Sequence, residues 1–315
     1  MSDAPPVLSV LIVNYNGRHL LGPCLEAIAR HLTVPHEVVL VDNASTDGSL
    51  EFVRARFPAV KRVASSTNRG FTGGNNLAAT HARGEFLVLL NSDTVLQSDL
   101  APLVAELADP AVGAAGCRLS YGDGRLQPSF GYEHTPLRLV LSWLGLYRVR
   151  RLPRVFRRVE VDPARYAVRQ PDVAWVSGAC LATRRSLWQA LEGLDERYFM
   201  YLEDVDFCRR LRERGLRVVY TPAARVTHLE GGGKPWIGRD ALLRTTRSYI
   251  AYAEKFFATP TVYAVRFWLA AVFGARALWY RAATLLAPAG TARDKSSAYL
   301  DAARVLVGRA PAGSR

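Results

Sequence analysis

The most constraining feature of the sequence is a short apolar run, FLVLLNSDT at residues 86–94, which ends abruptly in polar residues. Five apolar residues are too few for an amphipathic helix and are typical of a strand buried on both faces. Asn91, Ser92 and Asp93 follow this strand directly. In open α/β sheets, ligands bind at the carboxyl ends of the strands. Asp93 is therefore a candidate metal ligand, although a carboxylate at this place can equally cap a helix.

Two earlier segments repeat the pattern of an apolar run that turns polar. VLSVLIVNYN at residues 7–16 ends in Asn14 and Asn16, and HEVVLVD ends in Asp42. Residues 20–32 between them have helical spacing, and a third strand is expected at residues 60–64. Strands that alternate with helices in this way predict a parallel sheet with right-handed crossovers.

Two later turns fit helix starts. After Asp42, Ser45 or Thr46 is expected to be the N-cap of the next helix. NRGFTGGNN at residues 68–76 is a glycine-rich turn that opens another helix, where the backbone can approach a ligand and the helix N-terminus favours phosphate. It does not have the GxGxxG spacing of dinucleotide-binding folds, so by itself it is weak evidence.

The sequence returns to core-like patterns after residue 170. A strand is expected at residues 173–177, followed by a helix from about Arg184. EDVDFCRRLRERG at residues 203–215 has acidic residues first, basic residues last and a terminal glycine, which suits the dipole of a helix that begins near Glu203. A short strand, a turn at Pro222 and a second extended segment that ends at His228 follow. From Gly238 onward the pattern is helical.

The net charge is +13, from 41 Lys plus Arg against 28 Asp plus Glu. Such an excess favours nucleic acid, anionic lipid or a phosphate-bearing substrate. We expect no nucleic-acid partner, because no zinc-finger, helix-turn-helix or RNA-binding motif accompanies the charge. The four cysteines are far apart in sequence, which suits reduced core residues, and the N-terminus lacks a basic leader. We therefore expect a cytoplasmic protein.

Two basic and apolar segments suggest contact with an anionic membrane surface. Residues 137–169 interleave arginines with leucine, tryptophan and tyrosine, and residues 261–286 form an apolar helix with Arg266, Arg276 and Arg281 in one broad sector. The alternatives are a solvated insertion for the first segment and, for the second, a helix packed on the catalytic domain with its basic face in water. We expect a catalytic domain at residues 1–235, with a donor half at about 1–118 and an acceptor half at about 119–235, and a helical extension at residues 236–315.

Six motifs occur together in one order: VDNASTD, NRGFTGGNN, LLNSDT, WVSGA, FMYLEDVDFCRRL and VTHLEGG. In this order they resemble family 2 glycosyltransferases with a GT-A fold, over residues 7–233. The Asn-x-Asp form at residues 91–93 resembles the branch that contains rhamnosyltransferases of bacterial polysaccharide and cell-wall assembly. The resemblance implies an α/β fold in which a mostly parallel, Rossmann-like nucleotide-binding sheet precedes an acceptor-binding half.

The resemblance also implies roles for residues in the donor half. Asp42 matches the residue that accepts a hydrogen bond from the pyrimidine N3–H of the donor, and a cation, Mn²⁺ or Mg²⁺, is expected at Asp93 and His228. Many relatives have an acidic residue at the position of Asn91, so this chain has one carboxylate fewer for the metal. The other candidate donor contacts are Asn14, Asn16, Asn68, Arg69, Gly70, Asn75, Asn91, Ser92, Gly178 and Ala179. For Asn14 and Asn16 a role in the turn is equally compatible.

In the acceptor half, the resemblance implies that Asp204 is the catalytic base that activates the acceptor hydroxyl. Glu203 and Trp175 are candidate acceptor contacts, although Trp175 is equally compatible with a place in the core. A role of the acidic residues in stabilising the start of the helix is compatible with catalysis by Asp204.

We therefore predict an inverting, metal-dependent glycosyltransferase. Its donor would be a dTDP- or UDP-linked sugar such as dTDP-L-rhamnose, its acceptor a saccharide or a polyprenyl-linked saccharide, and its place the inner face of the cell membrane as a peripheral protein. Two alternatives stay open. A nucleotidyltransferase on the same sheet would release pyrophosphate, and a non-catalytic polysaccharide-binding or scaffold protein would not turn over a donor.

Overall fold

A computed structural model describes residues 6–144, 153–229, 238–286 and 290–310 of the chain. These residues group into two compact units. Unit 1 comprises residues 1–132, 159–199 and 203–233, and unit 2 comprises residues 133–158, 200–202 and 234–315. The basic segment expected at residues 137–169 is thus divided between the units, and its residues 145–152 lie outside the described residues. So do residues 230–232 of the VTHLEGG motif.

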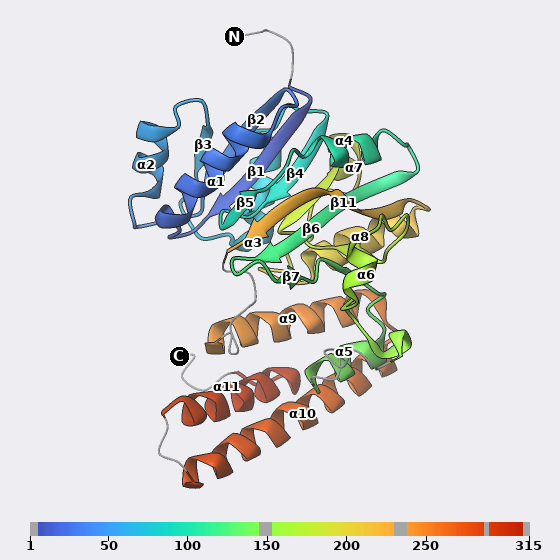
Figure 1. Ribbon diagram of the computed structural model, residues 1–315. Helices are drawn as coiled ribbons and strands as arrows, with labels where there is room; N and C mark the ends of the chain where they lie inside the picture. The colour runs from blue at the N-terminus through green and yellow to red at the C-terminus, as the bar shows by residue number, and fades with distance from the viewer. Residues whose placement is uncertain (1–5, 145–152, 230–237, 287–289, 311–315) are drawn as a thin grey trace. The chain divides into compact units, whose positions relative to one another are not determined.

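Unit 1 is built on a mixed sheet that has nine strands within the described residues, with the order β3-β2-β1-β4-β10-β6-β11-β5 and β7 beside β6 (Figure 1). Neighbouring strands from β3 to β4 are parallel, and β10 is antiparallel to both β4 and β6. The strands are β1 (Leu8–Asn14), β2 (His36–Asp42), β3 (Lys61–Ala64), β4 (Phe86–Leu90), β5 (Thr94–Leu96), β6 (Val112–Tyr121), β7 (Leu126–Gln127), β10 (Cys180–Arg184) and β11 (Arg217–His228). A separate two-stranded sheet pairs β8 (Phe130–Gly131) with β9 (Trp175–Val176).

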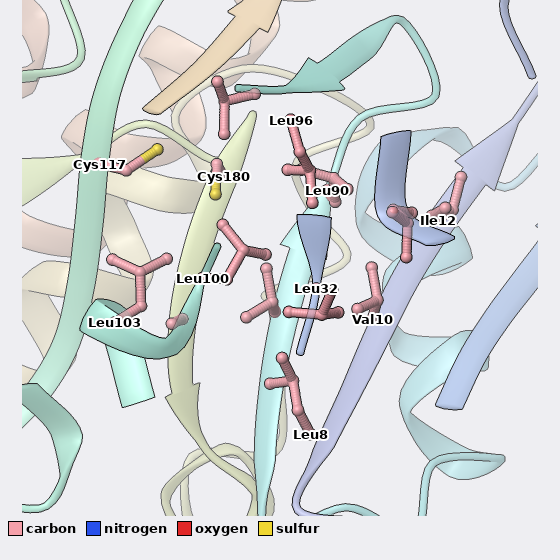
Figure 2. Close-up of a cluster of buried hydrophobic side chains, with 14 of the residues drawn as sticks. Leu8, Val10, Ile12, Leu32, Leu90, Leu96, Leu100, Leu103, Cys117 and Cys180 are labelled. Carbon is pink, nitrogen blue, oxygen red and sulfur yellow. The ribbon is translucent and has the colours of Figure 1, made fainter. Parts of the chain in front are cut away.

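Helices cover both faces of the large sheet. They are α1 (Arg18–His31), α2 (Ser49–Arg56), α3 (Gly70–Thr80), α4 (Ala101–Leu107), α7 (Arg185–Ala190) and α8 (Glu203–Glu213), and unit 1 also contains the one-turn helix α6 (Pro163–Tyr166). Leu8, Val10 and Ile12 of β1 share a buried cluster with residues of α1, α2 and α4, part of which Figure 2 shows. Val13 of β1 is instead the neighbour of Gly74 in α3. Alternate residues of β1 therefore face two helical layers, as the side-chain period of two requires.

These elements confirm the predicted α/β fold with a mostly parallel sheet and flanking helices. The four cysteines are free and buried, and Cys117 and Cys180 lie on adjacent strands in Figure 2. The predicted N-cap at Ser45 or Thr46 is wrong: α2 begins at Ser49, after Gly48 with φ 76°. Four strands were not predicted, namely β5, β7, β8 and β10, because each has only two to five residues, too few for a clear apolar periodicity.

Unit 2 is helical in its described residues. It contains α5 (Pro136–Trp143), a 3₁₀ turn (Arg154–Phe156), α9 (Gly238–Phe256), α10 (Thr259–Leu286) and α11 (Gly290–Leu306). Helix α10 packs beside α11 and α5 (Figure 1), with Phe273 against Trp143 at a ring-centroid distance of 4.8 Å. Asp301 of α11 is 1% exposed and pairs with Arg239 of α9 at 2.7 Å. Burial is tolerable for this carboxylate because it is paired.

The placement of the arginines on α10 differs from the prediction. Arg266 Nε donates to the carbonyl of Leu306 at 2.7 Å, and its Nη1 pairs with Glu254 at 3.2 Å. Arg276 Nη1 donates to the hydroxyl of Tyr299 at 2.8 Å. Two of the three arginines therefore join helices within unit 2, and a basic face in water is wrong for them, because spacing in sequence does not reveal the bonding partners.

Candidate functional site

The ends of β1 and β2 hold Asn14 and Asp42 side by side. The two residues are opposite each other in the parallel register, and both are buried. Asn14 Nδ2 donates to Asp42 Oδ1 at 3.3 Å, and the backbone N–H of Ser45 donates to Asp42 Oδ2 at 3.0 Å. The Asp42 carboxylate is thereby fixed at the carboxyl edge of the sheet. A donor contact at Asp42 stays a prediction.

Asn16 has the turn role that the sequence left open. Its φ is 50°, in the left-handed region that asparagine tolerates. Its Oδ1 accepts a hydrogen bond from the backbone N–H of Thr46 at 2.8 Å, and its own N–H donates to Ser45 Oγ at 3.0 Å. The loops after β1 and β2 are therefore joined through these residues.

Asn43 is a structural residue of the site that the sequence analysis did not single out. Its side chain is 1% exposed, and Nδ2 donates to Asn68 Oδ1 at 3.0 Å and to the carbonyl of Gly70 at 2.9 Å. Its Oδ1 accepts from the backbone N–H of Arg69 at 2.9 Å. Asn43 thus connects the end of β2 to the start of α3. The available signal was its position beside Asp42 in VDNASTD.

The start of α3 requires a glycine at position 70. Gly70 has φ 70°, and a Cβ at this position would lie 2.2 Å from the carbonyl oxygen of Phe199. The same carbonyl accepts from the N–H of Phe71 at 2.9 Å. Glycine is therefore needed for conformation and for space. These contacts join α3 to the segment before α8.

The other predicted donor residues on α3 differ in exposure. Arg69 is exposed, which leaves its guanidinium accessible to an anion. Asn75 is 1% exposed, and its Nδ2 donates to the carbonyl of Phe71 at 2.9 Å. Its Oδ1 is buried without a partner among the described residues, so a donor contact at Asn75 stays a prediction.

Gly178 and Ala179 join two other parts of the site. The N–H of Gly178 donates to Asp204 Oδ2 at 2.9 Å, and the carbonyl of Ala179 accepts from the N–H of Asn91 at 3.1 Å. A Cβ at position 178 would be 3.4 Å from both Asp204 and Phe71, which is ordinary van der Waals contact. This two-residue loop therefore places the first turn of α8 and the end of β4 close together.

Asp204 and Glu203 are neighbours in the first turn of α8 but have different surroundings. Asp204 is half-buried, and its Oδ1 accepts from the N–H of Val205 at 2.8 Å, so both of its oxygens accept a backbone hydrogen bond. Such bonds stabilise a carboxylate. Glu203 is 6% exposed, and its Oε2 has no hydrogen-bond partner among the described residues. Burial, and then the charge of Asp204, raise the pKa of Glu203 well above its usual value.

Asp206 and Trp175 have structural contacts. Asp206 is fully buried and pairs with Arg210 at 2.6 Å and with the hydroxyl of Tyr198 at 3.2 Å. Trp175 is 8% exposed, and its Nε1 donates to the carbonyl of Tyr132 at 3.2 Å. The burial of Trp175 favours the core alternative over acceptor contact.

Asp93 and His228 meet at the other end of the site. Thr94 of β5 is paired with His228 of β11 in the antiparallel register, so Asp93 and Asn91 lie beside the imidazole. His228 Nε2 is 3.0 Å from Asp93 Oδ1 and 3.1 Å from Asn91 Nδ2. Ser92, between these residues in sequence, is half-buried. The predicted pair of metal-binding side chains is therefore adjacent.

Gln127 of β7 is a second residue that the sequence analysis missed. Its side-chain amide lies 3.1 Å from His228 Nδ1. A neutral imidazole has one N–H, so the amides of Asn91 and Gln127 cannot both donate to it. If Gln127 presents its oxygen, which is otherwise buried without a partner, it accepts from Nδ1–H, and Nε2 keeps the lone pair that accepts from Asn91 Nδ2 or that a cation would need. No motif includes Gln127. Only the pairing of β7 with β6 brings it to His228.

The two candidate ligands, Asp93 and His228, fit a hard divalent cation whose other ligands would be substrate phosphate oxygens and water. Asp93 offers an oxygen, and His228 offers Nε2 in the tautomer that Gln127 can hold. The Oδ1 of Asn91 is a buried oxygen without a partner beside them. Among the described residues, no group of three or more His, Cys, Asp or Glu side chains is arranged to hold a metal ion.

The sequence and the fold match known proteins. A sequence model described as glycosyltransferase like family 2 matches residues 5–247. An N-acetylglucosaminyl-diphospho-decaprenol L-rhamnosyltransferase of Mycobacterium tuberculosis (strain CDC 1551 / Oshkosh) is 31% identical over 241 residues, which cover 70% of this chain and 76% of that protein. A rhamnosyltransferase of Escherichia coli (strain K12) is 41% identical over 172 residues, 50% of this chain and 60% of that protein.

The fold also resembles that of a solved enzyme. A mannosyltransferase from Pyrobaculum calidifontis, in complex with GDP-Man and Mn²⁺, has a TM-score of 0.57 and 22% sequence identity, over 96% of this chain and 87% of that one. At this identity the likeness applies to the fold alone.

Proposed function

Because the chain belongs to glycosyltransferase-like family 2 and is therefore a glycosyltransferase, we propose that it is an inverting enzyme that transfers a sugar from a pyrimidine nucleoside diphosphate to a saccharide. The observation that supports this proposal best is the loop at Gly178 and Ala179. It contacts Asp204 through one backbone group and Asn91 through the next. A candidate base and a candidate diphosphate site are therefore held beside one loop with small side chains.

The donor would occupy the carboxyl edge of the sheet in unit 1. Asp42, fixed by Asn14 and Ser45, would accept the N3–H of the pyrimidine. The exposed guanidinium of Arg69 would pair with the diphosphate. L-rhamnose is the proposed sugar, because relatives at 31% and 41% identity are named as rhamnosyltransferases.

The diphosphate that leaves requires neutralisation of its charge. Asp93 and His228 would hold Mn²⁺ or Mg²⁺, and the bound cation would neutralise the developing negative charge on the diphosphate. Asn91 supplies an amide in place of a second carboxylate, so metal affinity is expected to depend on bound nucleotide. Gln127 would keep the imidazole of His228 oriented.

Asp204 would accept the proton of the acceptor hydroxyl as that oxygen attacks the anomeric carbon. Attack from the face opposite the diphosphate inverts the configuration. The hydrogen bonds from Gly178 and Val205 hold the carboxylate in one orientation, which a positioned base requires. Glu203 and Trp175 stay proposed contacts on the acceptor side. Both are largely buried.

The acceptor would be a saccharide carried on a polyprenyl diphosphate, and the enzyme a peripheral protein on the inner face of the cell membrane. The name of the mycobacterial relative, which includes a decaprenol-linked sugar, supports this acceptor class. The basic and apolar residues of unit 2 support the location.

Asp204→Asn tests the assignment of the base. We expect this variant to bind the nucleoside diphosphate normally in a thermal-shift titration, and to lose transfer by a factor on the order of 10² to 10⁴, the contribution usual for a general base. Asp172→Asn is a matched control in unit 1, since this aspartate is about half exposed, 51% for its side chain, and lies outside the site. Undiminished release of nucleoside diphosphate by Asp204→Asn would refute the assignment, and release of pyrophosphate by the wild type would identify a nucleotidyltransferase.

A further inference from the structure

Helix α10 has one exposed face that is mostly apolar, with Arg281 near its C-terminal end. Its large exposed side chains are 57–69% accessible and comprise Tyr263, Phe267, Trp268, Leu278 and Trp279. At about 100° per residue these five positions fall within a sector of about 160°. Isolated exposed apolar residues are ordinary, but five large ones on one face of one helix indicate an interaction surface. We call this set the α10 face.

The rest of α10 is used within unit 2. Val262, Val265, Leu269 and Phe273 are buried, and Arg266 and Arg276 are bonded to neighbouring groups of the same unit. The α10 face is therefore the side that remains after the helix has packed against its own unit. Both tryptophans of the face are of the residue type enriched at membrane–water interfaces.

By length and composition, α10 is the one described helix that could cross a membrane, over residues 259–284. Its partner argues against that arrangement. Helix α11 packs along α10 (Figure 1) and contains Arg293, Asp294, Lys295, Asp301 and Arg304. A spanning α10 would take these charges into the hydrocarbon or would have to separate from α11, and either is costly. A helix that lies in the plane of the surface avoids both costs.

The net charge of the chain is concentrated in the same unit. Unit 2 contains 20 Lys plus Arg and 5 Asp plus Glu, a net charge of +15, whereas unit 1 contains 21 and 23, a net charge of −2. The positive excess is therefore absent from the unit that contains the candidate nucleotide site. An apolar helical face on a strongly basic unit is complementary to an anionic lipid surface, with acyl chains for the face and headgroups for the charge.

We propose that unit 2 docks on an anionic membrane surface through α10, which lies parallel to the surface with the α10 face at the boundary between headgroups and acyl chains. This inference deepens the proposed function, which places the acceptor in a membrane, and rests on it for its biological purpose. Vesicle binding itself needs neither donor nor acceptor, so it can be measured separately from transfer.

The first experiment is co-sedimentation of the full-length protein with vesicles of phosphatidylcholine, with and without one quarter phosphatidylglycerol. We expect binding to the anionic vesicles and about tenfold or greater weakening in Leu278→Ser/Trp279→Ser, since two large apolar side chains leave the interface. Val168→Ser removes an exposed apolar side chain, 56% accessible, from unit 1 and should bind as the wild type does. Equal binding of all three proteins would overturn the proposal.

The second experiment measures the depth of the two tryptophans. They are 11 residues apart, about 16 Å along a helix axis. In vesicles with brominated acyl chains, the quenching of tryptophan fluorescence reports the depth of each side chain. The signal of each tryptophan is identified as the part that is lost in Trp268→Phe or in Trp279→Phe. We expect the same depth for both. Clearly different depths would indicate a spanning helix and refute the parallel arrangement.

Two further outcomes are decisive. If the wild type is a dimer by light scattering, fails to bind anionic vesicles, and becomes a monomer in Leu278→Ser/Trp279→Ser, a second copy of the chain covers the α10 face and the proposal is wrong.

Asp204→Asn should bind vesicles as tightly as the wild type. Failure of transfer with intact vesicle binding would count against the proposed function and leave the membrane proposal standing.

Discussion

At the scale of single residues, the site depends on side chains that orient the candidate ligands and the candidate base through hydrogen bonds. The sequence motifs identified Asp93 and His228, and the structure places them 3.0 Å apart. The motifs did not identify Gln127, because it comes from a two-residue strand with no distinctive pattern. A residue that only orients a metal-binding side chain through a hydrogen bond is difficult to predict from sequence, because its role depends on strand register.

Gln127→Leu should weaken metal binding without changing the fold. The variant leaves Nδ1 of His228 without its amide partner, so the imidazole loses a fixed orientation. We expect the affinity for Mn²⁺, titrated by electron paramagnetic resonance with a nucleoside diphosphate present, to fall by roughly 10- to 100-fold. Gln97→Leu, an exposed glutamine just after β5, is the control. An unchanged Mn²⁺ affinity in Gln127→Leu would show that His228 is positioned by other contacts.

Glu203 should make stability depend on pH. Burial raises its pKa in the folded state above that of the unfolded chain, so the folded protein binds the extra proton. The contribution of Glu203 to the free energy of unfolding is fully present below its pKa in the unfolded chain. It is lost as the pH rises toward its pKa in the folded protein, by up to about 1.4 kcal/mol per pH unit.

Glu203→Gln removes this titration while it keeps the shape of the side chain. We expect the variant to melt at a higher temperature than the wild type at pH 8, and the difference to shrink toward pH 5. Thermal denaturation followed by circular dichroism at the two pH values measures this. Parallel melting curves for the two proteins at all pH values would mean that Glu203 is ionised in the folded state.

At the scale of elements, the sequence predicted strands and helices where apolar periodicity was long, and missed those that tertiary pairing creates. β1, β2, β4 and α8 were found at or near their observed ends. β10 was missed because its five residues follow the turn at Gly178 and lead directly into a helix. The N-cap of α2 was misplaced because Ser45 binds Asn14 and Asp42 across the loop instead of capping the helix.

The start of α3 gives a prediction at this scale. Gly70→Ala would place a methyl group 2.2 Å from the carbonyl of Phe199, in a left-handed conformation that alanine disfavours. The chain before α8 must then move, and we expect a loss of about 1–3 kcal/mol of unfolding free energy together with reduced transfer. Gly124→Ala is the control for the conformational cost alone. Its φ is 81° and nothing lies within 4 Å of an added Cβ.

Urea denaturation of the two variants separates the effects. A larger loss in Gly70→Ala than in Gly124→Ala reports the steric conflict with Phe199. If the two losses are equal, backbone conformation is the whole effect and α3 tolerates a shifted neighbour. Transfer activity should stay normal in Gly124→Ala, since an added Cβ at this position has no neighbour within 4 Å.

At the scale of the whole molecule, the division of charge separates two kinds of binding. Composition alone predicted an anionic partner but could not say which part of the chain would meet it. The two units place that charge: −2 with the candidate nucleotide site and +15 with the α10 face. Long-range attraction between exposed charges is screened by salt, whereas contacts of a partly buried site are screened less.

Salt should therefore affect vesicle binding and donor binding unequally. Between about 0.05 M and 0.5 M NaCl the Debye length falls from about 14 Å to about 4 Å, so we expect anionic vesicle binding to weaken at least tenfold. The KM for the donor with a water-soluble acceptor should change by less than about threefold, because Asp42 and Asn14 are buried and the unit has little net charge. Parallel measurement of the two quantities in one salt series tests the division. If the donor KM rises as steeply as vesicle binding falls, the basic residues of unit 2 assist the nucleotide, and the charge serves the reaction directly.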